Sequence, residues 1–196
     1  MGLAQKVKRY TPQEYYRLER DAQTKHEYFD GEIFAMAGGS VNHGRICSSI
    51  LRAIGNRLEG SPCEAFTSDL RLQVKATGLR TYPDVSVYCG PLESDPEDST
   101  GQTVTNPTVL FEVLSKTTES YDRKSKANNY RKIESLKALV LVSQAGAQIE
   151  LYERQANGTW TVQDIEGLDA KLAIPCLNVT VPLSDIYARV DFNATE

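Results

Sequence analysis

Long hydrophobic runs are absent from this chain of 196 residues. Its longest apolar stretches, such as residues 138–142, are far shorter than the roughly 18 residues that a transmembrane helix needs. The first ten residues, MGLAQKVKRY, carry positive charges, but no apolar segment of the kind found in secretory signal peptides follows them. The sequence therefore predicts a protein without a membrane span or an export signal, and we expect it in the cytoplasm.

Cysteine is also scarce, and Cys47, Cys63, Cys89 and Cys176 are widely separated along the sequence. No CxxC pair occurs, and no histidine accompanies the cysteines in the pattern of a zinc site. A chain of this length can build its own hydrophobic core without a disulfide framework. We therefore expect four reduced, mostly buried thiols.

A large excess of one charge is missing as well, because 26 acidic and 22 basic residues leave a formal net charge of −4. This balance excludes a basic coat, so any surface that binds nucleic acid must be a local patch. The composition, with 40% apolar and 24% charged residues, is typical of a folded globular domain. Neither an internal repeat nor a break in composition divides the chain, and we predict one domain over residues 1–196.

The first part of the chain shows helix and hairpin signals. Residues 11–14, TPQE, combine a capping threonine, a proline at the first helical position and a glutamate three residues after the cap, which together open a helix. The Asp-Gly pair at residues 30–31, between two aromatic or aliphatic runs, indicates a tight hairpin turn with Glu32 at the start of the second strand. Apolar residues at intervals of three and four over residues 43–58 then predict an amphipathic helix.

The rest of the chain is rich in strand signals. We predict an antiparallel hairpin from residues 63–75 and 81–88, then a surface loop over residues 90–106. A strand, a helix and a strand are expected at residues 109–114, 120–134 and 138–143. A further hairpin at residues 148–153 and 159–163 and a short final helix at residues 184–190 follow. This order predicts an α/β fold with a mixed β-sheet flanked by helices and a β-rich C-terminal extension.

Two acidic residues stand in apolar strand segments. Asp84 follows Pro83, and a proline is confined to a strand edge, a first residue or a bulge, so backbone pairing is interrupted at this carboxylate. Glu112 is the only polar side chain within residues 109–114, and alternation places it on the face of Leu110 and Leu114. A charge in such surroundings is costly unless a partner such as a cation compensates it.

The predicted helix after this strand carries Asp122, Lys126 and Tyr130 at steps of four, which puts all three on one face. From that face Lys126 could reach back to Glu112. Two neighbouring carboxylates and a lysine match the needs of metal-assisted phosphoryl transfer. This chemistry requires hard oxygen ligands for Mg²⁺, a cation for the extra transition-state charge and an attacking water.

The ordered set of motifs resembles the Uma2 family, which is described as a family of endonucleases and was formerly a domain of unknown function. The motifs that carry the resemblance are Asp30-Gly31-Glu32, His43, Pro83-Asp84-Val85, Phe111-Glu112-Val113-Leu114-Ser115, and Asp122, Lys126 and Tyr130. The resemblance covers a core over about residues 11–153 and leaves residues 154–196 as C-terminal strands and a short helix. It implies membership of the PD-(D/E)XK nuclease superfamily and hence a restriction-endonuclease-like α/β core.

The resemblance also implies which residues bind metal. In the superfamily, the aspartate of the PD pair and the following acid bind Mg²⁺, which here are Asp84 and Glu112, with the Val113 carbonyl as a further ligand. The superfamily lysine normally stands two residues after the second acid, where this chain has Leu114. Uma2-like sequences have a lysine on the next helix instead, which matches Lys126.

Three more residues are candidates for supporting roles. Glu32 resembles the extra acid that many superfamily members bring to the metal directly or through water. His43 shares a helix face with apolar residues, so a hydrogen-bonded histidine at the edge of the core and a catalytic histidine are equally good interpretations. Tyr130 is more typical of packing than of a direct chemical role.

The principal candidates have structural alternatives too. Asp84 could cap the end of a strand, and Glu112 could form a buried ion pair with Lys126. Lys126 stands in a helix crowded with basic residues, where a solvated face is the usual meaning of a run of charges. The ordered set of motifs favours metal ligation over these alternatives.

These observations predict a Mg²⁺-dependent endonuclease that hydrolyses phosphodiester bonds of DNA, with Mn²⁺ as a substitute ion. Asp84 and Glu112 would hold the metal, and Lys126 would stabilise the developing charge or orient the attacking water. The basic residues that would form a local phosphate-binding rim are Arg71, Lys75, Arg80, Lys116, Arg123 and Lys124.

Two other functions fit the same pattern. Because a fold does not determine a function, a catalytically inactive nuclease-fold module that binds DNA or another partner is the main alternative, and Leu114 at the usual lysine position supports it. Hydrolysis of a different phosphoester is the third interpretation. Superfamily members often dimerise to cut two strands, so a homodimer is expected by analogy.

Overall fold

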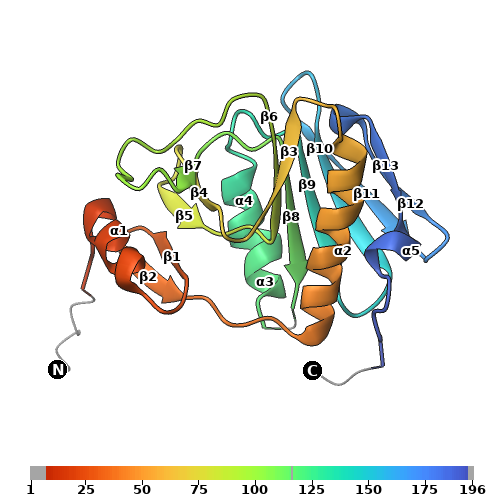
Figure 1. The fold of residues 1–196 in the computed structure, drawn as a ribbon, viewed down its shortest axis with the longest axis horizontal. Coiled ribbons are helices and arrows are strands. Elements are labelled where there is room, and N and C mark those ends of the chain that lie inside the picture. Colours follow the sequence, from red (N-terminus) through yellow and green to blue (C-terminus); the bar gives the residue numbers. More distant parts are fainter. Residues whose placement is uncertain (1–7, 116, 194–196) are drawn as a thin grey trace.

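The computed structural model describes residues 8–115 and 117–193, which form three β-sheets with helices around them (Figure 1). The six strands of the principal sheet are, in spatial order, β11 (Trp160–Glu166), β10 (Gln148–Arg154), β9 (Ala138–Ser143), β8 (Val109–Leu114), β6 (Val85–Cys89) and β3 (Cys63–Thr67). The five strands of the second sheet are β2 (Glu32–Ala35), β1 (His26–Phe29), β5 (Leu79–Thr81), β4 (Arg71–Val74) and β7 (Thr103–Val104). A C-terminal hairpin consists of β12 (Lys171–Ile174) and β13 (Val179–Pro182).

The principal sheet is mixed, as predicted. Strands β8 and β9 run parallel, whereas the other neighbouring strands of this sheet are antiparallel. The crossover between β8 and β9 is a continuous helical segment of α3 (Glu119–Tyr121), a π-helical turn η1 (Asp122–Lys126) and α4 (Ala127–Tyr130). The predicted strand at residues 109–114 is present as β8, and all six of its residues are buried, as in a central strand covered on both faces.

Two hydrophobic layers cover the faces of the principal sheet. Helix α2 (Val41–Leu58) packs on one face, where its residue Ile50 belongs to the same cluster as Phe111. The C-terminal hairpin and α5 (Leu183–Ile186) complete that layer. The crossover helix and the second sheet pack on the opposite face, where Tyr130 and Leu72 join Leu110 in one cluster. Glu112, next to Leu110 in the alternation, faces this second layer.

Local signals explain how the N-terminal elements begin. The predicted capping box at α1 (Pro12–Asp21) is present, because the backbone N–H of Glu14 donates to Thr11 Oγ1 and the N–H of Thr11 donates to the Glu14 carboxylate. Ser40 caps α2 and accepts from the N–H of His43, which places His43 in the first turn of that helix. Residues 30–31 form the predicted turn between β1 and β2, and both have positive φ angles.

The predicted antiparallel hairpin from residues 63–75 and 81–88 is present, but it is divided between two sheets. Its turn end, formed by β4 and β5, belongs to the second sheet. Strands β3 and β6 pair with each other in the principal sheet. Alternation with a period of two identifies strands but does not say which sheet they join. The chain returns to the principal sheet through residues 82–84, where Pro83 interrupts the ladder as expected.

The segment over residues 90–106 runs mostly at the surface, as predicted, but buried charges anchor it to the second sheet. Its strand β7 pairs parallel to β4. Asp95 is buried against Arg80, and Asp98 against Arg71, with nitrogen–oxygen distances of 3.2 and 3.4 Å. Hydrophobic periodicity cannot reveal such a segment, because polar side chains provide its tertiary contacts.

The cysteine prediction is wrong for two of the four residues. Cys63 and Cys89 lie directly opposite each other in the pairing of β3 with β6 and form a disulfide. Cys47 is a free, half-buried thiol, and Cys176 is free and exposed. The spacing of 26 residues between Cys63 and Cys89 carries no signal of this pairing, which depends on the strand register.

The helices are shorter than their predictions in two places. The crossover helix ends at Tyr130 instead of residue 134, and the final helix is the single turn α5 instead of residues 184–190. None of the described helices combines the length and the apolar character that crossing a membrane requires.

Candidate active site

Asp84 lies immediately before β6, beside the central strand β8. The pairing of β6 with β8 ends at Val85 opposite Phe111, so Val113 lies beyond the last β6 partner. Asp84 Oδ2 accepts a hydrogen bond from the backbone N–H of Val113 at 2.7 Å. Because the N–H and C=O of one strand residue point toward the same edge, the Val113 carbonyl also faces this gap. The carboxylate and the carbonyl therefore present oxygen atoms at the same edge of β8.

Glu112 is fixed from the crossover helix. Its side chain is 5% exposed and lies next to Lys126 and Tyr130. The Tyr130 hydroxyl donates to Glu112 Oε1 at 2.6 Å, and Lys126 Nζ lies 3.0 Å from the same oxygen. Both contacts involve Oε1, so Oε2 is the oxygen that a cation could use. The helix face thus reaches back to Glu112, as its spacing indicates.

Lys126 is the centre of a buried charge cluster. Its ammonium group lies 3.2 Å from Glu27 and 3.9 Å from Asp122, in addition to its contact with Glu112. The side chain is 6% exposed, so the solvated alternative for Lys126 is wrong. Burial acts to lower the pKa of Lys126, but the surrounding carboxylates outweigh it and raise the pKa well above its ordinary value. The lysine is therefore a permanent cation.

The carboxyl groups of this cluster outnumber its one ammonium group. Burial raises the pKa of Glu112 to about 8, and the charges of Asp84 and Asp122 add to the increase, while Lys126 and Tyr130 oppose it. Burial also raises the pKa of Asp122, assisted by the charge of Asp84. A divalent cation would relieve this repulsion. The oxygen donors of Asp84, Glu112 and Val113 are of the hard type that Mg²⁺ prefers, so the residues fit the ion.

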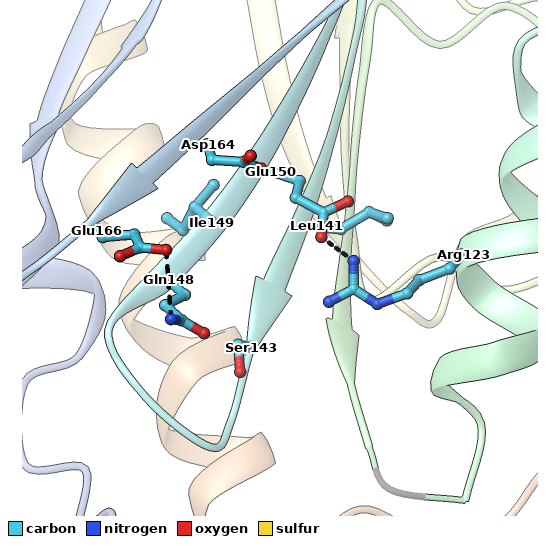
Figure 2. Close-up of a pocket in the computed structure, with 8 residues that line it drawn as sticks. All are labelled: Arg123, Leu141, Ser143, Gln148, Ile149, Glu150, Asp164 and Glu166. Atoms are coloured by element: carbon cyan, nitrogen blue, oxygen red, sulfur yellow. Dashed lines mark hydrogen bonds and ion pairs between the residues drawn. The ribbon is translucent and has the colours of Figure 1, made fainter.

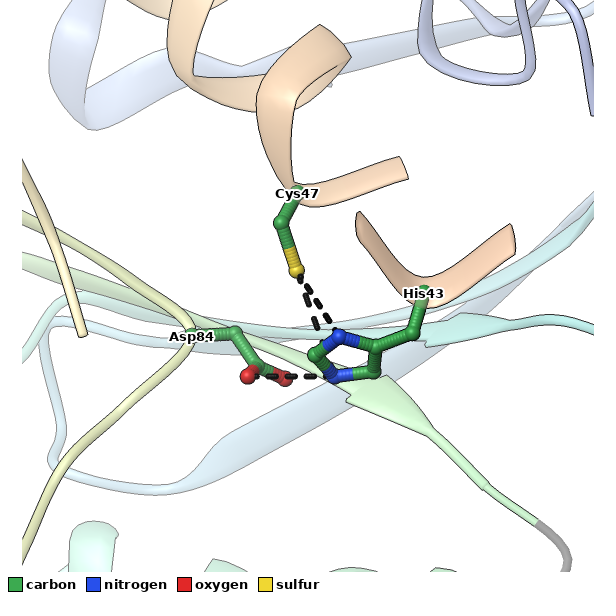
Figure 3. A group of neighbouring side chains, drawn as sticks. All are labelled: His43, Cys47 and Asp84. Atoms are coloured by element: carbon green, nitrogen blue, oxygen red, sulfur yellow. Dashed lines mark hydrogen bonds and ion pairs between the residues drawn. The ribbon is translucent and has the colours of Figure 1, made fainter. Parts of the chain in front are cut away.

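His43 and Cys47 lie on the other side of Asp84 (Figure 3). His43 Nε2 is 3.2 Å from Asp84 Oδ1, and this hydrogen bond raises the pKa of His43 although burial acts to lower it. Cys47 Sγ is 3.5 Å from His43 Nδ1. These three residues line an open cavity of about 190 Å³. Asp84 thus stands between the buried Glu112 cluster and a cavity open to solvent.

Glu32 is not the extra acid of this cluster. It pairs with Phe29 at the turn end of the β1–β2 hairpin, where its charge acts on Arg9. Glu27, at the other end of β1, occupies the expected place, because it is buried and contacts Lys126. Its carboxylate also accepts hydrogen bonds from Thr81 and from the Tyr121 hydroxyl.

The sequence does hold a weak signal for Glu27. Alternation places Glu27 on the same strand face as Phe29, which packs against the hydrophobic layer around Tyr130. Asp122 is the other acid of the cluster that lies outside the predicted metal ligands, although its spacing from Lys126 puts it on the right helix face.

Two of the arginines predicted for the phosphate-binding rim cannot serve it. Arg80 is buried and paired with Asp95 and Glu97, and Arg71 is buried and paired with Asp98. The positive charges of both side chains are already compensated inside the protein, so they are not available to a phosphate group. The sequence around a basic residue in a strand does not reveal an acidic partner that stands more than ten residues away in the chain.

The remaining basic residues of the predicted rim differ in their surroundings. Lys75 pairs with Glu93 at the surface, and Arg123 pairs with Glu119 and Glu150. Arg123 lies next to Glu150 (Figure 2), and both residues line a small cavity of about 70 Å³ beside β9, β10 and β11. Lys124 is exposed, and Lys116 lies outside the described residues. Lys124 is the member of this set that stays a direct candidate for contact with phosphate.

A solved structure has a similar fold. It is the crystal structure of "a putative nuclease belonging to DUF820" from Anabaena variabilis ATCC 29413, with a TM-score of 0.72. The match covers 89% of this chain and 96% of that chain at 17% sequence identity. At this identity the likeness concerns the fold, which is α/β and restriction-endonuclease-like, as predicted.

Sequence comparisons then identify the family. The model of the family described as "Uma2: Putative restriction endonuclease" matches residues 12–184. Two uncharacterised proteins of Synechocystis sp. (strain ATCC 27184 / PCC 6803 / Kazusa) are similar along most of their length. One, slr1290, is 37% identical over 183 residues, covering 93% of each chain, and the other, sll1609, is 30% identical over 171 residues, covering 86% of this chain and 94% of its own. The chain belongs to the Uma2 family, which confirms the resemblance.

Proposed function

We propose that this protein is a Mg²⁺-dependent endonuclease that hydrolyses phosphodiester bonds of DNA. One observation carries the proposal: the Asp84 carboxylate lines an open cavity and lies beside a buried cluster of Glu112, Lys126 and Tyr130. The descriptions of the family and of the structural relative support nuclease chemistry for this protein.

Asp84, Glu112 and the Val113 carbonyl are the residues that would hold the ion. When bound, Mg²⁺ polarises a phosphate oxygen and lowers the pKa of a water molecule, which makes hydroxide available near neutral pH. The protein contributes by fixing its oxygen donors in advance. Val113 N–H orients Asp84 Oδ2, and Tyr130 and Lys126 fix Oε1 of Glu112.

Lys126 supplies the positive charge of the protein itself. Glu27 and Asp122 hold its ammonium group from two further sides, so the group cannot swing away from Glu112. In a buried environment this charge would stabilise the negative charge that develops on the phosphate during cleavage. Lys126 would therefore replace the superfamily lysine whose place Leu114 takes. This catalytic role of Lys126 differs from that of a structural ion pair, because the catalytic role requires that phosphate reach the Asp84 side of the cluster.

Parallel titrations of Mg²⁺ and Mn²⁺ into the wild type and into Glu112→Gln test the proposal. Metal binding is followed by calorimetry and cleavage by nicking of a supercoiled plasmid. We expect the wild type to bind metal and to nick the plasmid, and the variant to lose both. Glu64→Gln is the matched control, since Glu64 is an exposed glutamate on the edge strand β3.

DNA-binding measurements on the same two proteins, with and without Mg²⁺, distinguish the proposed nuclease from the alternative of a catalytically inactive module. A module without catalysis would bind a DNA duplex equally with and without Mg²⁺, and Glu112→Gln would bind as well as the wild type. If the wild type nicks the plasmid and Glu112→Gln nicks it equally well, the result would contradict the proposed site. The ratio of nicked to linear plasmid, together with light scattering, would also show whether a homodimer acts on both strands.

A further inference from the structure

His43, Cys47 and Asp84 bring three different metal-binding groups to the rim of the open cavity. His43 and Cys47 stand four residues apart on α2, so consecutive turns of the helix present the imidazole and the thiol on one face. Asp84 approaches from the segment between β5 and β6. Figure 3 shows the imidazole ring between the thiol and the carboxylate, with all three side chains pointing toward one another.

The distances between these groups are slightly longer than those of ligands around one small ion. One ligand atom from each residue can be chosen so that all three lie within 4.8 Å of one another. His43 Nε2 is 3.2 Å from Asp84 Oδ1 and 4.0 Å from Cys47 Sγ. Tetrahedral bonds of about 2.0 Å to nitrogen or oxygen and about 2.3 Å to sulfur put neighbouring ligands roughly 3.3 to 3.6 Å apart. Small changes in the side-chain torsion angles would therefore bring the three ligand atoms to coordination distance from one ion.

We propose that His43, Cys47 and Asp84 form a site for a borderline-soft divalent cation of the Zn²⁺ type, distinct in ligand chemistry from the Mg²⁺ site. A thiol and an imidazole are poor ligands for Mg²⁺ but favourable for Zn²⁺ or Co²⁺. Three protein ligands leave a fourth position for water. The cavity supplies that position, since it is open to solvent and the side chains of Ser48, Thr67 and Ser68 also line it.

A nucleophilic cysteine is the competing interpretation of the same trio. Cys47, His43 and Asp84 do lie in the order of a thiol, a base and an orienting acid. However, Cys47 lies in the interior of α2, where backbone N–H groups are committed to the helix and cannot stabilise an oxyanion. Burial also raises the pKa of the Cys47 thiol, which disfavours the thiolate in the free protein. The metal site needs neither feature, because a bound cation itself displaces the thiol proton.

The shared carboxylate links the two sites. Asp84 would serve Mg²⁺ with Glu112 in the proposed nuclease and Zn²⁺ with His43 and Cys47 here. This consequence rests on the proposed function: Zn²⁺ should inhibit plasmid nicking by competing for Asp84, and the inhibition should require Cys47. The binding of the soft cation itself does not depend on nuclease activity.

Co²⁺ absorption spectroscopy tests the site directly, because coordination by a thiolate produces an intense near-ultraviolet charge-transfer band that oxygen ligands do not give. Co²⁺ is titrated in non-reducing buffer, where Cys63 and Cys89 are paired, so Cys47 and Cys176 are the free thiols. We expect one Co²⁺ per wild-type chain, with a thiolate band that Zn²⁺ displaces. Cys47→Ser should abolish the band and weaken Zn²⁺ binding by roughly tenfold or more. The matched control Cys176→Ser should keep both.

Further variants separate this site from the nuclease site. Glu112→Gln should retain the band, because Glu112 is not among the three ligands, whereas His43→Ala should weaken it. The site is refuted if the wild type shows no thiolate band, or if Cys47→Ser retains the band while circular dichroism shows both proteins folded. In nicking assays, Zn²⁺ should inhibit Cys176→Ser at a concentration roughly tenfold lower than Cys47→Ser. If the wild type nicks no plasmid, the nuclease proposal fails while the Co²⁺ band still decides the metal site.

Discussion

Lys126 is the cation that contacts three buried carboxyl groups, so its removal should affect both stability and activity. In Lys126→Met, Glu27, Glu112 and Asp122 keep their burial but lose their cation. Removing one partner of a buried ion pair typically costs about 3 to 5 kcal/mol. We expect a loss of this size in the free energy of unfolding by urea, and a fall in nicking rate of roughly a hundredfold. Lys124→Met, at an exposed position of the same helix, should change the unfolding free energy by less than about 0.5 kcal/mol.

The outcome for Lys126 separates a working site from a passive ion pair. Equal stability of Lys126→Met and Lys124→Met would contradict the buried cluster. Lys126→Met should be assayed below its unfolding temperature. If it is destabilised but nicks DNA as fast as the wild type, the role of Lys126 is structural only.

Glu27 and Glu32 provide a matched pair at opposite ends of one hairpin. Glu27→Gln removes the charge that faces Lys126, and we expect a loss of about 1 to 3 kcal/mol in the free energy of unfolding. Glu32→Gln should stay within about 0.5 kcal/mol of the wild type. Nicking should fall roughly tenfold in Glu27→Gln only. Urea titration and the plasmid assay on both variants check this. A larger effect of Glu32→Gln than of Glu27→Gln would support Glu32 as the extra acid that the resemblance implies.

At the scale of elements, the sequence predicts best the segments whose neighbours are close in the chain. The unit from β8 through the crossover helix to β9 was predictable, because continuous apolar runs and a helical period follow one another directly. The same local spacing brought Lys126 to Glu112. The predicted hairpin of residues 63–75 and 81–88 likewise matches the pairing of β3 with β6 and of β4 with β5. Its division between two sheets could not be predicted, because alternation does not say which sheet a strand joins. The sequence named Glu32 instead of Glu27 for a similar reason, because the choice depends on which end of the β1–β2 hairpin meets the crossover helix.

The β3–β6 pair contains the disulfide, which should stabilise this edge of the principal sheet. Closing a loop of 26 residues between Cys63 and Cys89 restricts the unfolded chain, and the chain-entropy model gives about 3.5 kcal/mol for it. We expect dithiothreitol to lower the free energy of unfolding of the wild type by about this amount. The double variant Cys63→Ala/Cys89→Ala should show no response to the reductant. Alkylation under denaturing, non-reducing conditions should label two thiols, and labelling of all four would contradict the disulfide.

At the scale of the whole molecule, buried ion pairs hold the segment over residues 90–106 against the second sheet. Arg80 contacts Asp95, and Arg71 contacts Asp98, with less than a tenth of each side chain exposed. Arg80 also donates to the Tyr16 hydroxyl of α1. The segment and α1 are therefore joined to the sheet by charges and hydrogen bonds more than by apolar contacts. This part of the molecule should be the most sensitive to acid.

Asp98 is the residue at which this acid sensitivity can be measured. Burial acts to raise the pKa of Asp98, but hydrogen bonds from Thr100 and Thr103 and the charge of Arg71 outweigh it and hold the pKa below its ordinary value. A carboxylate whose pKa is lower in the folded state stabilises the protein above its unfolded pKa of about 4. That contribution is lost as the pH falls through the folded pKa. The wild type should therefore lose stability below about pH 4, with Asp98 responsible for part of the loss.

Asp98→Asn should separate this contribution from those of other acids. At pH 7 the variant leaves Arg71 buried without its partner, and we expect its free energy of unfolding to be about 3 to 5 kcal/mol lower than that of the wild type. The difference should shrink as the pH falls through the folded pKa of Asp98, because the protonated wild-type residue no longer neutralises Arg71 either. Asp164→Asn, at an exposed position of β11, is the control and should follow the wild type at every pH. Urea unfolding at pH 7, 5, 4 and 3 measures all three proteins, and a difference for Asp98→Asn that stays constant with pH would show that the buried pair does not cause the acid sensitivity.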